Sequence, residues 1–338
     1  MNEQQLLAAA QDGDENAFAG LIEPYRRELQ AHCYRMLGSK VDAEDALQDA
    51  LLGAWRGLPR FEARSSLRSW LYKIATNACL RAIERRPKRV LPIDYGPPSD
   101  PHNASSEPLI ESVWIEPFPD TMLADTATSE ARYEQREAVE LAFIAALQHL
   151  PARQRAVLIL RDVLGYSARE TAEALDTTPV SIDSALQRAH KAVDARLPER
   201  SQQATLQSLD DGDLKRVVED FVAAWERADV DAVVAMLAQD AVLTMPPQAT
   251  WFSGAGTIGA FLAAYPLAPD APRIRLVPTQ ANGQMAFGHY SWRAEENAFM
   301  PHAITVLSLS GAHIAEITIF KSAEAFGGFD LPARIEAA

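Results

Sequence analysis

The chain has 338 residues, which is long for one domain and predicts two or three. Its only cysteines, Cys33 and Cys79, lie within apolar helical patterns, which argues against a disulfide framework or a cysteine-based metal site and favours a reducing compartment. The net charge is −14, yet residues 60–90 carry nine basic side chains against two acidic ones. A local basic face on an acidic chain fits contact with nucleic acid at a restricted site.

Neither a leader peptide nor a membrane span is visible in the sequence. The first residues have no basic and apolar leader pattern, and no apolar run approaches the roughly 20 residues needed to cross a bilayer. We therefore expect a cytoplasmic protein without membrane contact, and nothing in the pattern predicts a cofactor or a bound metal.

Helical spacing of apolar residues covers residues 5–86. Gly38 ends one helix, and acidic residues open the next, where the helix dipole favours them. Ser65 and Ser66 are placed to cap a third helix over residues 67–86, which Pro87 ends.

A proline-rich stretch follows at residues 87–130 and predicts an extended linker. Trp114, Ile115 and Phe118 are candidate anchors within it.

Helical periodicity returns over residues 131–198. Helices are expected at residues 154–164, 167–175 and 179–195, with a short turn at 176–178. Two short helices joined in this way predict a helix-turn-helix, and Pro179 suits the first position of the last helix.

The last third of the chain combines helices with strands. Helices are expected at residues 214–228 and 230–237. Alternating apolar runs then predict five strands, at residues 241–245, 274–279, 285–292, 302–309 and 313–320. Helices followed by a meander of strands indicate an α+β domain.

Three segments resemble known families. The segment 43–80 resembles sigma-70 region 2 of extracytoplasmic-function (ECF) factors, and its sequence is AEDALQDALLGAWRGLPRFEARSSLRSWLYKIATNACL. Region 4 of the same factors resembles residues 150–193, LPARQRAVLILRDVLGYSARETAEALDTTPVSIDSALQRAHKAV. The SnoaL-like branch of the NTF2-like superfamily resembles residues 213–247, DLKRVVEDFVAAWERADVDAVVAMLAQDAVLTMPP.

The resemblance implies a multidomain protein with two all-α sigma domains and a C-terminal α+β cone. Its segments would be region 2 at residues 5–86, a linker at 87–130, region 4 at 131–198 and the NTF2-like domain at 210–330. The implied function is that of a sigma factor, which binds core RNA polymerase through the β′ coiled coil and the β flap, recognises promoter DNA and initiates transcription.

The implied polymerase contacts are Asp45, Gln48 and Asp49 on an acidic helix. Charge pattern alone would favour an ordinary solvated face, and the surrounding motif favours the functional interpretation.

For the −10 element, the implied contacts combine phosphate-binding cations with an amide that can meet an unstacked base. They are Arg68, Lys73, Asn77, Arg81 and Arg85. The ECF pattern usually has Asp where this chain has Arg81, a departure that favours an additional phosphate contact.

For the −35 element, the recognition helix should enter the major groove and present its N-terminal residues to base edges. The candidates are Thr178, Ser181, Ser184, Gln187, Arg188 and Lys191. Arg188 and Gln187 have the chemistry for direct base readout.

The C-terminal domain leaves several interpretations open. Its candidate cavity residues are Trp225, Met245, Trp251, Phe261, His289, Tyr290, Trp292 and Phe320. No nucleophile–base pair or paired acid is evident, so we expect no enzyme activity, and intramolecular regulation of the sigma domains is the leading interpretation. The alternatives are an NTF2-like enzyme or a sensor of a small-molecule ligand, fused to a DNA-binding array. A stand-alone helix-turn-helix repressor would explain region 4 but not region 2.

Overall fold

The computed structural model describes residues 2–103, 114–124 and 128–337. Within these ranges, no helix has both the length and the apolar character needed to cross a membrane. No group of histidine, cysteine, aspartate or glutamate in the same ranges is arranged to hold a metal ion.

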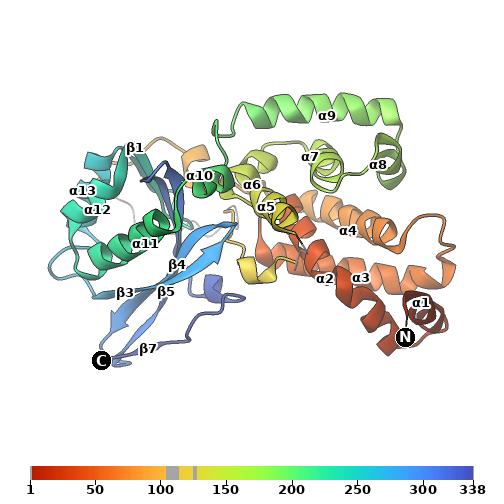
Figure 1. Ribbon diagram of the computed structural model, residues 1–338, viewed down its shortest axis with the longest axis horizontal. Coiled ribbons are helices and arrows are strands. Elements are labelled where there is room, and N and C mark those ends of the chain that lie inside the picture. Colours follow the sequence, from red (N-terminus) through yellow and green to blue (C-terminus); the bar gives the residue numbers. More distant parts are fainter. Residues whose placement is uncertain (1, 104–113, 125–127, 338) are drawn as a thin grey trace. The chain divides into compact units, whose positions relative to one another are not determined.

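The chain divides into two compact units (Figure 1). The helical unit contains the described residues of Met1–Lys88 and Met122–Leu197. The C-terminal unit contains those of Arg89–Thr121 and Pro198–Ala338. Much of the predicted linker therefore belongs to the C-terminal unit, and its residues 104–113 and 125–127 lie outside the described part of the chain.

The helical unit is built from nine described α-helices. They are α1 (Glu3–Gln11), α2 (Glu15–Leu37), α3 (Lys40–Gly57), α4 (Leu67–Ile83), α5 (Ser129–Glu137), α6 (Leu141–Gln148), α7 (Ala152–Leu158), α8 (Ala168–Ala174) and α9 (Pro179–Asp194). Short 3-10 turns occur as η1 (Leu58–Arg60) and η3 (Asp120–Met122), and a π-helical turn, η4 (Ile159–Val163), follows α7.

Local sequence explains where the first helices begin and end. Ser39 and Ser66 cap α3 and α4 by accepting backbone N–H bonds, and Gly38 closes α2 in the left-handed conformation at φ 68°. Helix α4 ends at Ile83, three residues before the predicted Arg86. The helix predicted over 154–164 is instead the α-helix α7 followed by the π-helical turn.

The C-terminal unit contains four described helices and one mixed sheet. Its helices are α10 (Gln202–Gln207), α11 (Asp211–Glu226), α12 (Val230–Met236) and α13 (Ala255–Ala264), with 3-10 turns η2 (Pro92–Asp94) and η5 (Glu324–Phe326). Its strands are β1 (Leu237–Thr244), β2 (Trp251–Ser253), β3 (Ile274–Ala281), β4 (Gln284–Arg293), β5 (Ala298–Ser310), β6 (His313–Phe320) and β7 (Ile335–Glu336).

The strands form one sheet in the order β2-β1-β6-β5-β4-β3, with β7 paired to β5. Strands β1 and β6 run parallel, and the other pairs are antiparallel. Helices α11 and α13 pack on β3 and β1 and enclose an apolar core that contains Phe221, Trp225, Phe252, Phe287 and Ile317. All five strand predictions correspond to observed strands, while β2, β7, α10 and α13 were not expected.

Candidate nucleic-acid and protein interfaces

Helix α3 presents one exposed face. Asp45, Gln48 and Asp49 are exposed along it, at the spacing that places side chains on the same side of a helix. Two large apolar side chains, Val41 and Leu52, are 53% and 54% exposed and extend the same face by one turn at each end. Their exposure was not predicted from the sequence, although their i, i+4 and i, i+7 spacing to the acidic residues was a signal for it.

The acidic end of this face is already in contact with a basic side chain. Arg86, which follows α4, donates to Asp45 Oδ2 at 3.3 Å and pairs with Asp42 on the buried side of α3. Asp45 is therefore partly neutralised within the unit, whereas Gln48 and Asp49 are exposed and Arg86 does not pair with them.

Helix α4 carries the row of candidate −10 contacts. Lys73, Asn77 and Arg81 recur every four residues along α4, and Arg85 continues the row just after the helix ends. Arg81 and Arg85 are exposed, whereas Lys73 and Asn77 are half-buried.

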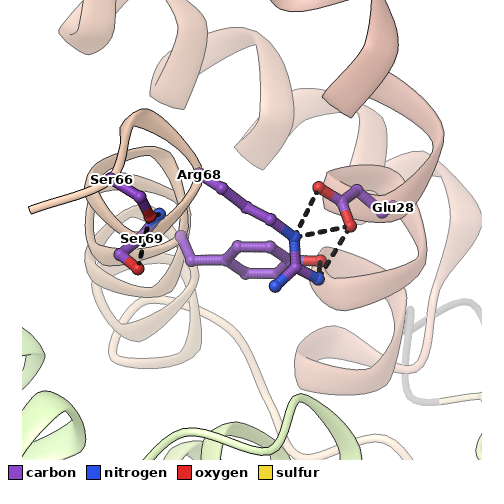
Figure 2. A network of polar contacts seen from close by, with 5 residues as sticks. Glu28, Ser66, Arg68 and Ser69 are labelled. Carbon is purple, nitrogen blue, oxygen red and sulfur yellow. Dashed lines mark hydrogen bonds and ion pairs between the residues drawn. The ribbon is translucent and has the colours of Figure 1, made fainter.

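Arg68 lies at the start of α4 and makes a dense set of contacts (Figure 2). Its Nε is 3.0 Å from both carboxylate oxygens of Glu28 on α2, and its Nη2 is 2.8 Å from Glu28 Oε2. The guanidinium also lies 4.8 Å from the ring centre of Tyr72. Burial acts to lower the pKa of Arg68, but the bond to Glu28 outweighs it and raises the pKa above its ordinary value, so this cation is permanently charged and locked between α2 and α4.

Lys73 is bound by region 4. Its Nζ donates to the carbonyl of Glu173 on α8 at 2.8 Å and to Asp176 Oδ1 at 2.9 Å. Asp176 lies in the turn of the helix-turn-helix in a left-handed conformation, φ 51°. The two DNA-binding candidates of the helical unit therefore touch each other through this lysine.

Two buried arginines strengthen the contact between the first four helices and α5–α9. Arg155 on α7 donates to the carbonyl of Met36 at the end of α2, to Gln148 Oε1 at 2.5 Å and to the carbonyls of Gln148 and Leu150. Arg35 on α2 donates to the carbonyl of Ala138 at 3.0 Å. Burial lowers the pKa of each guanidinium to about 10, and both keep their charge at neutral pH.

The helix-turn-helix is formed by α8 and α9, with α7 beneath them (Figure 1). Ser167 opens α8 in a capping box with Glu170, and Thr178 caps α9 with Pro179 at its first position. Ile182 faces the core, whereas every candidate −35 contact is exposed. These exposed residues are Thr178, Ser181, Ser184, Gln187, Arg188 and Lys191.

Strand alternation divides the eight candidate cavity residues between two faces of the C-terminal sheet. Trp225, Met245 and Phe261 belong to the helix-covered core. His289 shares that face, because it pairs with Leu276 and Ala303, which are also core residues.

The other four candidates lie outside this core cluster. Tyr290 and Trp292 alternate with His289 and point to the opposite face, where the Tyr290 hydroxyl donates to the carbonyl of Pro332 at 2.7 Å. Phe320 pairs with Ile304, also outside the core cluster, and Trp251 pairs with Thr244 and contacts the linker instead.

The predicted linker anchors are buried in the C-terminal unit. Trp114, Ile115 and Phe118 are 5%, 1% and 0% exposed. Phe118 exchanges two bonds with Asn282 in the β3–β4 turn, from its N–H to Asn282 Oδ1 at 2.9 Å and from the Asn282 N–H to its carbonyl at 2.8 Å. The anchor prediction is confirmed.

The first half of the linker is held at the other edge of the sheet. The Trp251 indole donates to the carbonyl of Gly96 at 2.8 Å, and the Ser99 N–H donates to the carbonyl of Trp251 at 2.8 Å. The Tyr265 hydroxyl at the end of α13 donates to the carbonyl of His102 at 3.2 Å.

The two ends of the linker meet. Val90 bridges to Trp114, and the Ile115 N–H donates to the carbonyl of Val90 at 3.1 Å. The buried Arg89 guanidinium donates to the carbonyl of Trp114 at 2.6 Å and to Glu116 Oε1 at 3.3 Å. We call the segment 90–115, closed by these contacts, the linker loop.

Comparison with known proteins identifies the parts of this arrangement. Family models match at Sigma-70 region 2 over residues 21–89, Sigma-70 region 4 over residues 140–193 and a SnoaL-like domain over residues 218–318. The ECF RNA polymerase sigma factor SigG of Mycobacterium tuberculosis is 39% identical over 315 residues, covering 93% of this chain and 84% of that protein. This chain belongs to the ECF sigma-70 family.

Other relatives agree with this assignment. The ECF sigma factor SigM of M. tuberculosis is 31% identical over 189 residues, which cover 56% of this chain and 81% of SigM. The crystal structure of the M. tuberculosis ECF sigma factor SigJ aligns with a TM-score of 0.56 at 19% identity and covers 91% of this chain and 97% of SigJ, which shows a shared fold.

Family membership gives the function at a coarse level. The chain is a sigma factor, not an enzyme, and sigma factors bind core RNA polymerase and promoter DNA. The multidomain fold class, with helical sigma regions and a C-terminal α+β domain, is confirmed.

Proposed function

We propose that the C-terminal unit regulates this ECF sigma factor by keeping the linker loop closed. The supporting observation is that the described linker residues 89–103 and 114–121 belong to the C-terminal unit, and that Val90 and Ile115 are hydrogen-bonded to each other. In this proposal the C-terminal unit is an intramolecular regulator, and tethering supplies a high effective concentration for the contact.

Chain length explains why loop closure would matter. An extended chain covers about 3.3–3.6 Å per residue, so the segment between Lys88 and Met122 could span more than about 100 Å when open. With the linker loop closed, only residues 88–90 and 115–122 remain to connect the two regions, which is about 30 Å.

Promoter geometry requires the longer span. The −10 and −35 elements are about 25 base pairs apart by their names, or about 85 Å at about 3.4 Å per base pair. Each sigma region has a radius of about 13 Å, so the two together supply about 25 Å and leave roughly 60 Å for the linker. The closed loop is too short for that distance, and the open linker is long enough, so closure is expected to inhibit.

Within the helical unit, we assign the sequence-derived segments and residues their family roles. The segments are 5–86, 87–130, 131–198 and 210–330. Asp45, Gln48 and Asp49 would contact the polymerase β′ coiled coil, and region 4 would contact the β flap. The −10 contacts would be Arg68, Lys73, Asn77, Arg81 and Arg85, and the −35 contacts would be Thr178, Ser181, Ser184, Gln187, Arg188 and Lys191.

Loosening the linker loop provides the test. Asn282→Gly removes the side-chain bond to Phe118, and glycine keeps the positive φ of 55° at that position. Trp251→Phe removes the bond to Gly96 and keeps an aromatic ring. Two lost hydrogen bonds weaken the contact by about 1–3 kcal/mol, so we expect the double variant to bind core RNA polymerase about tenfold more tightly.

A matched control is available in the same unit. Asn297 has a positive φ of 47° in the turn between β4 and β5, where its N–H donates to the carbonyl of Ala294 and not to the linker. Asn297→Gly should leave polymerase affinity and run-off transcription unchanged. If the double variant also behaves like the unaltered chain in both assays, regulation through the linker loop is refuted.

A further inference from the structure

The helix-covered face of the C-terminal sheet contains polar side chains within an apolar core. Strand register places them there: His289 pairs with Leu276 and Ala303, and Thr305 pairs with Phe287, all on the core side. Trp225 reaches the same place from α11, with its ring centre 5.5 Å from that of His289 and nearly perpendicular to it.

These three side chains are buried without hydrogen-bond partners. Trp225, His289 and Thr305 are 2%, 5% and 1% exposed. Among the residues that the structure describes, Trp225 Nε1, His289 Nδ1 and Thr305 Oγ1 have no hydrogen-bond partner. Each such group costs about 1–3 kcal/mol, and native cores rarely retain several in one place unless something satisfies them.

A row of basic groups leads outward from His289. The ring of His302 lies 5.6 Å from the ring of His289, and His302 is the extra residue of a β-bulge between Pro301 and Ala303. Lys321 follows β6, is half-buried, and lies 3.4 Å from Gln248 Oε1 through its Nζ. Lys321 has no ion pair within the described part of the chain.

The electrostatics of this row favour an anion. Burial lowers the pKa of His289 to about 3, and His302 and Lys321 act in the same direction. Burial lowers the pKa of His302 to about 4, and Lys321 and Arg293 again add to the effect. Burial also lowers the pKa of Lys321. Every charge that shifts the two imidazoles is basic, so the row lacks the carboxylate that a half-buried lysine normally pairs with.

We propose that this face of the C-terminal unit binds a small, largely apolar carboxylic acid that carries a second oxygen. The carboxylate would pair with Lys321 and accept a hydrogen bond from the neutral imidazole of His302, and the apolar body would lie beside His289 and Trp225. The second oxygen would be a hydroxyl or carbonyl that meets Trp225, His289 or Thr305. This site is separate from the linker contacts, so it does not depend on the regulatory role proposed above.

The test uses the full-length chain and two probe acids, 4-hydroxyphenylacetate and octanoate, each compared with its neutral amide. Binding is followed by isothermal calorimetry and by histidine ring signals in NMR spectra. We expect 4-hydroxyphenylacetate to bind more tightly than octanoate, because it carries the second oxygen, and we expect both acids to bind at least tenfold more tightly than their amides. The His289 and His302 signals should shift on binding.

Two variants test the charge of Lys321 and the buried hydroxyl of Thr305 separately. Lys321→Met should weaken the acids at least tenfold and leave the amides unchanged, whereas Lys215→Met on the exposed side of α11 should change neither. Thr305→Val, which keeps the side-chain shape, should weaken 4-hydroxyphenylacetate more than octanoate.

Three results would overturn the proposal. These are no binding of either acid at millimolar concentration, equal affinity for acids and amides, or unchanged affinity in Lys321→Met with its circular dichroism spectrum preserved. The linker is not part of this site. Unchanged transcription in the linker-loop variants would therefore not contradict acid binding, and failure of the acids to bind would not contradict regulation by the linker loop.

Discussion

Helices α9 and α4 each carry a row of candidate DNA contacts, but the two rows differ in what surrounds them. On α9 all six candidates are exposed, and the core side is marked by Ile182. On α4, Arg68 is bound by Glu28 and Lys73 by Asp176, before any DNA is present. Under the contacts proposed above, region 4 would meet a −35 element as it stands, whereas region 2 would have to exchange internal partners for DNA.

The largest expected effect is on the exposed helix. Arg188→Ala should weaken binding of a promoter fragment by about 1–3 kcal/mol, or roughly 5–150-fold, if Arg188 contacts a base edge. Electrophoretic mobility shifts with fragments altered only at the −35 element would measure it. The control Arg216→Ala, on α11, should have no effect, and an equal loss on every −35 sequence would show a phosphate contact instead.

The second effect is a pH dependence of folding stability that arises from a buried histidine in region 2. His32 is fully buried beside Thr76 in region 2, and burial lowers its pKa to about 3 from 6.5. The unfolded chain takes up a proton below pH 6.5 and the folded chain does not, so stability is full above pH 6.5 and falls as the pH drops toward 3. At pH 5 the loss is about 2 kcal/mol at 1.36 kcal/mol per pH unit.

Urea unfolding of the unaltered chain and of His32→Asn at pH 7.5 and pH 5 would measure this contribution. The variant should show a smaller pH dependence, and His313→Asn, at an exposed position, should not differ from the unaltered chain. Equal pH dependence in His32→Asn and the unaltered chain would contradict a neutral buried imidazole.

The third effect concerns the ion pair between the two rows. Asp176→Asn removes the charge and suits the left-handed backbone at this position. An exposed pair contributes about 0.2–1 kcal/mol, so release of Lys73 should raise affinity for single-stranded −10 DNA by up to about fivefold. Fluorescence anisotropy would measure it, with Asp220→Asn on α11 as control. Weaker binding by Asp176→Asn would instead indicate that the turn of the helix-turn-helix supports the binding of −10 DNA by region 2.

The smallest effect distinguishes two arginines within region 2. Arg81 is exposed, so Arg81→Ala should reduce the slope of log affinity against log salt by about one. Arg68 has to leave Glu28 before it can contact a phosphate, so Arg68→Ala should reduce the slope by less than Arg81→Ala does and should also lower stability. Equal slopes for the two variants would remove the distinction between internal and DNA-facing cations.

Local chemistry made much of this fold predictable. Caps at Ser66 and Thr178, the stop at Gly38 and the alternation along β3–β6 depend on neighbouring residues, so the sequence carries them directly. The anchors Trp114 and Phe118 were predictable because large apolar side chains in a polar linker have to be buried.

Other features depend on residues far apart in the chain. Lys73 and Asp176 are 103 residues apart, and neither position has a local pattern that points to the other. The period of two along β4 sends Tyr290 and Trp292 to the face opposite His289, and their aromatic character alone does not distinguish the two faces. Helix α13 (AGTIGAFLAA) is hard to predict because two glycines and a single polar residue, Thr257, leave little helical period to see.

The distance between regions 2 and 4 tests the central claim most directly. Spin labels at Glu23→Cys on α2 and Asp194→Cys on α9 occupy exposed positions, and the native Cys33 and Cys79 are buried. Double electron–electron resonance should give one narrow distance in the free chain. The Asn282→Gly/Trp251→Phe variant should add a population that is longer by tens of ångströms, and so should holoenzyme on promoter DNA. A distribution that is the same in the free chain and the variant would contradict closure by the linker loop.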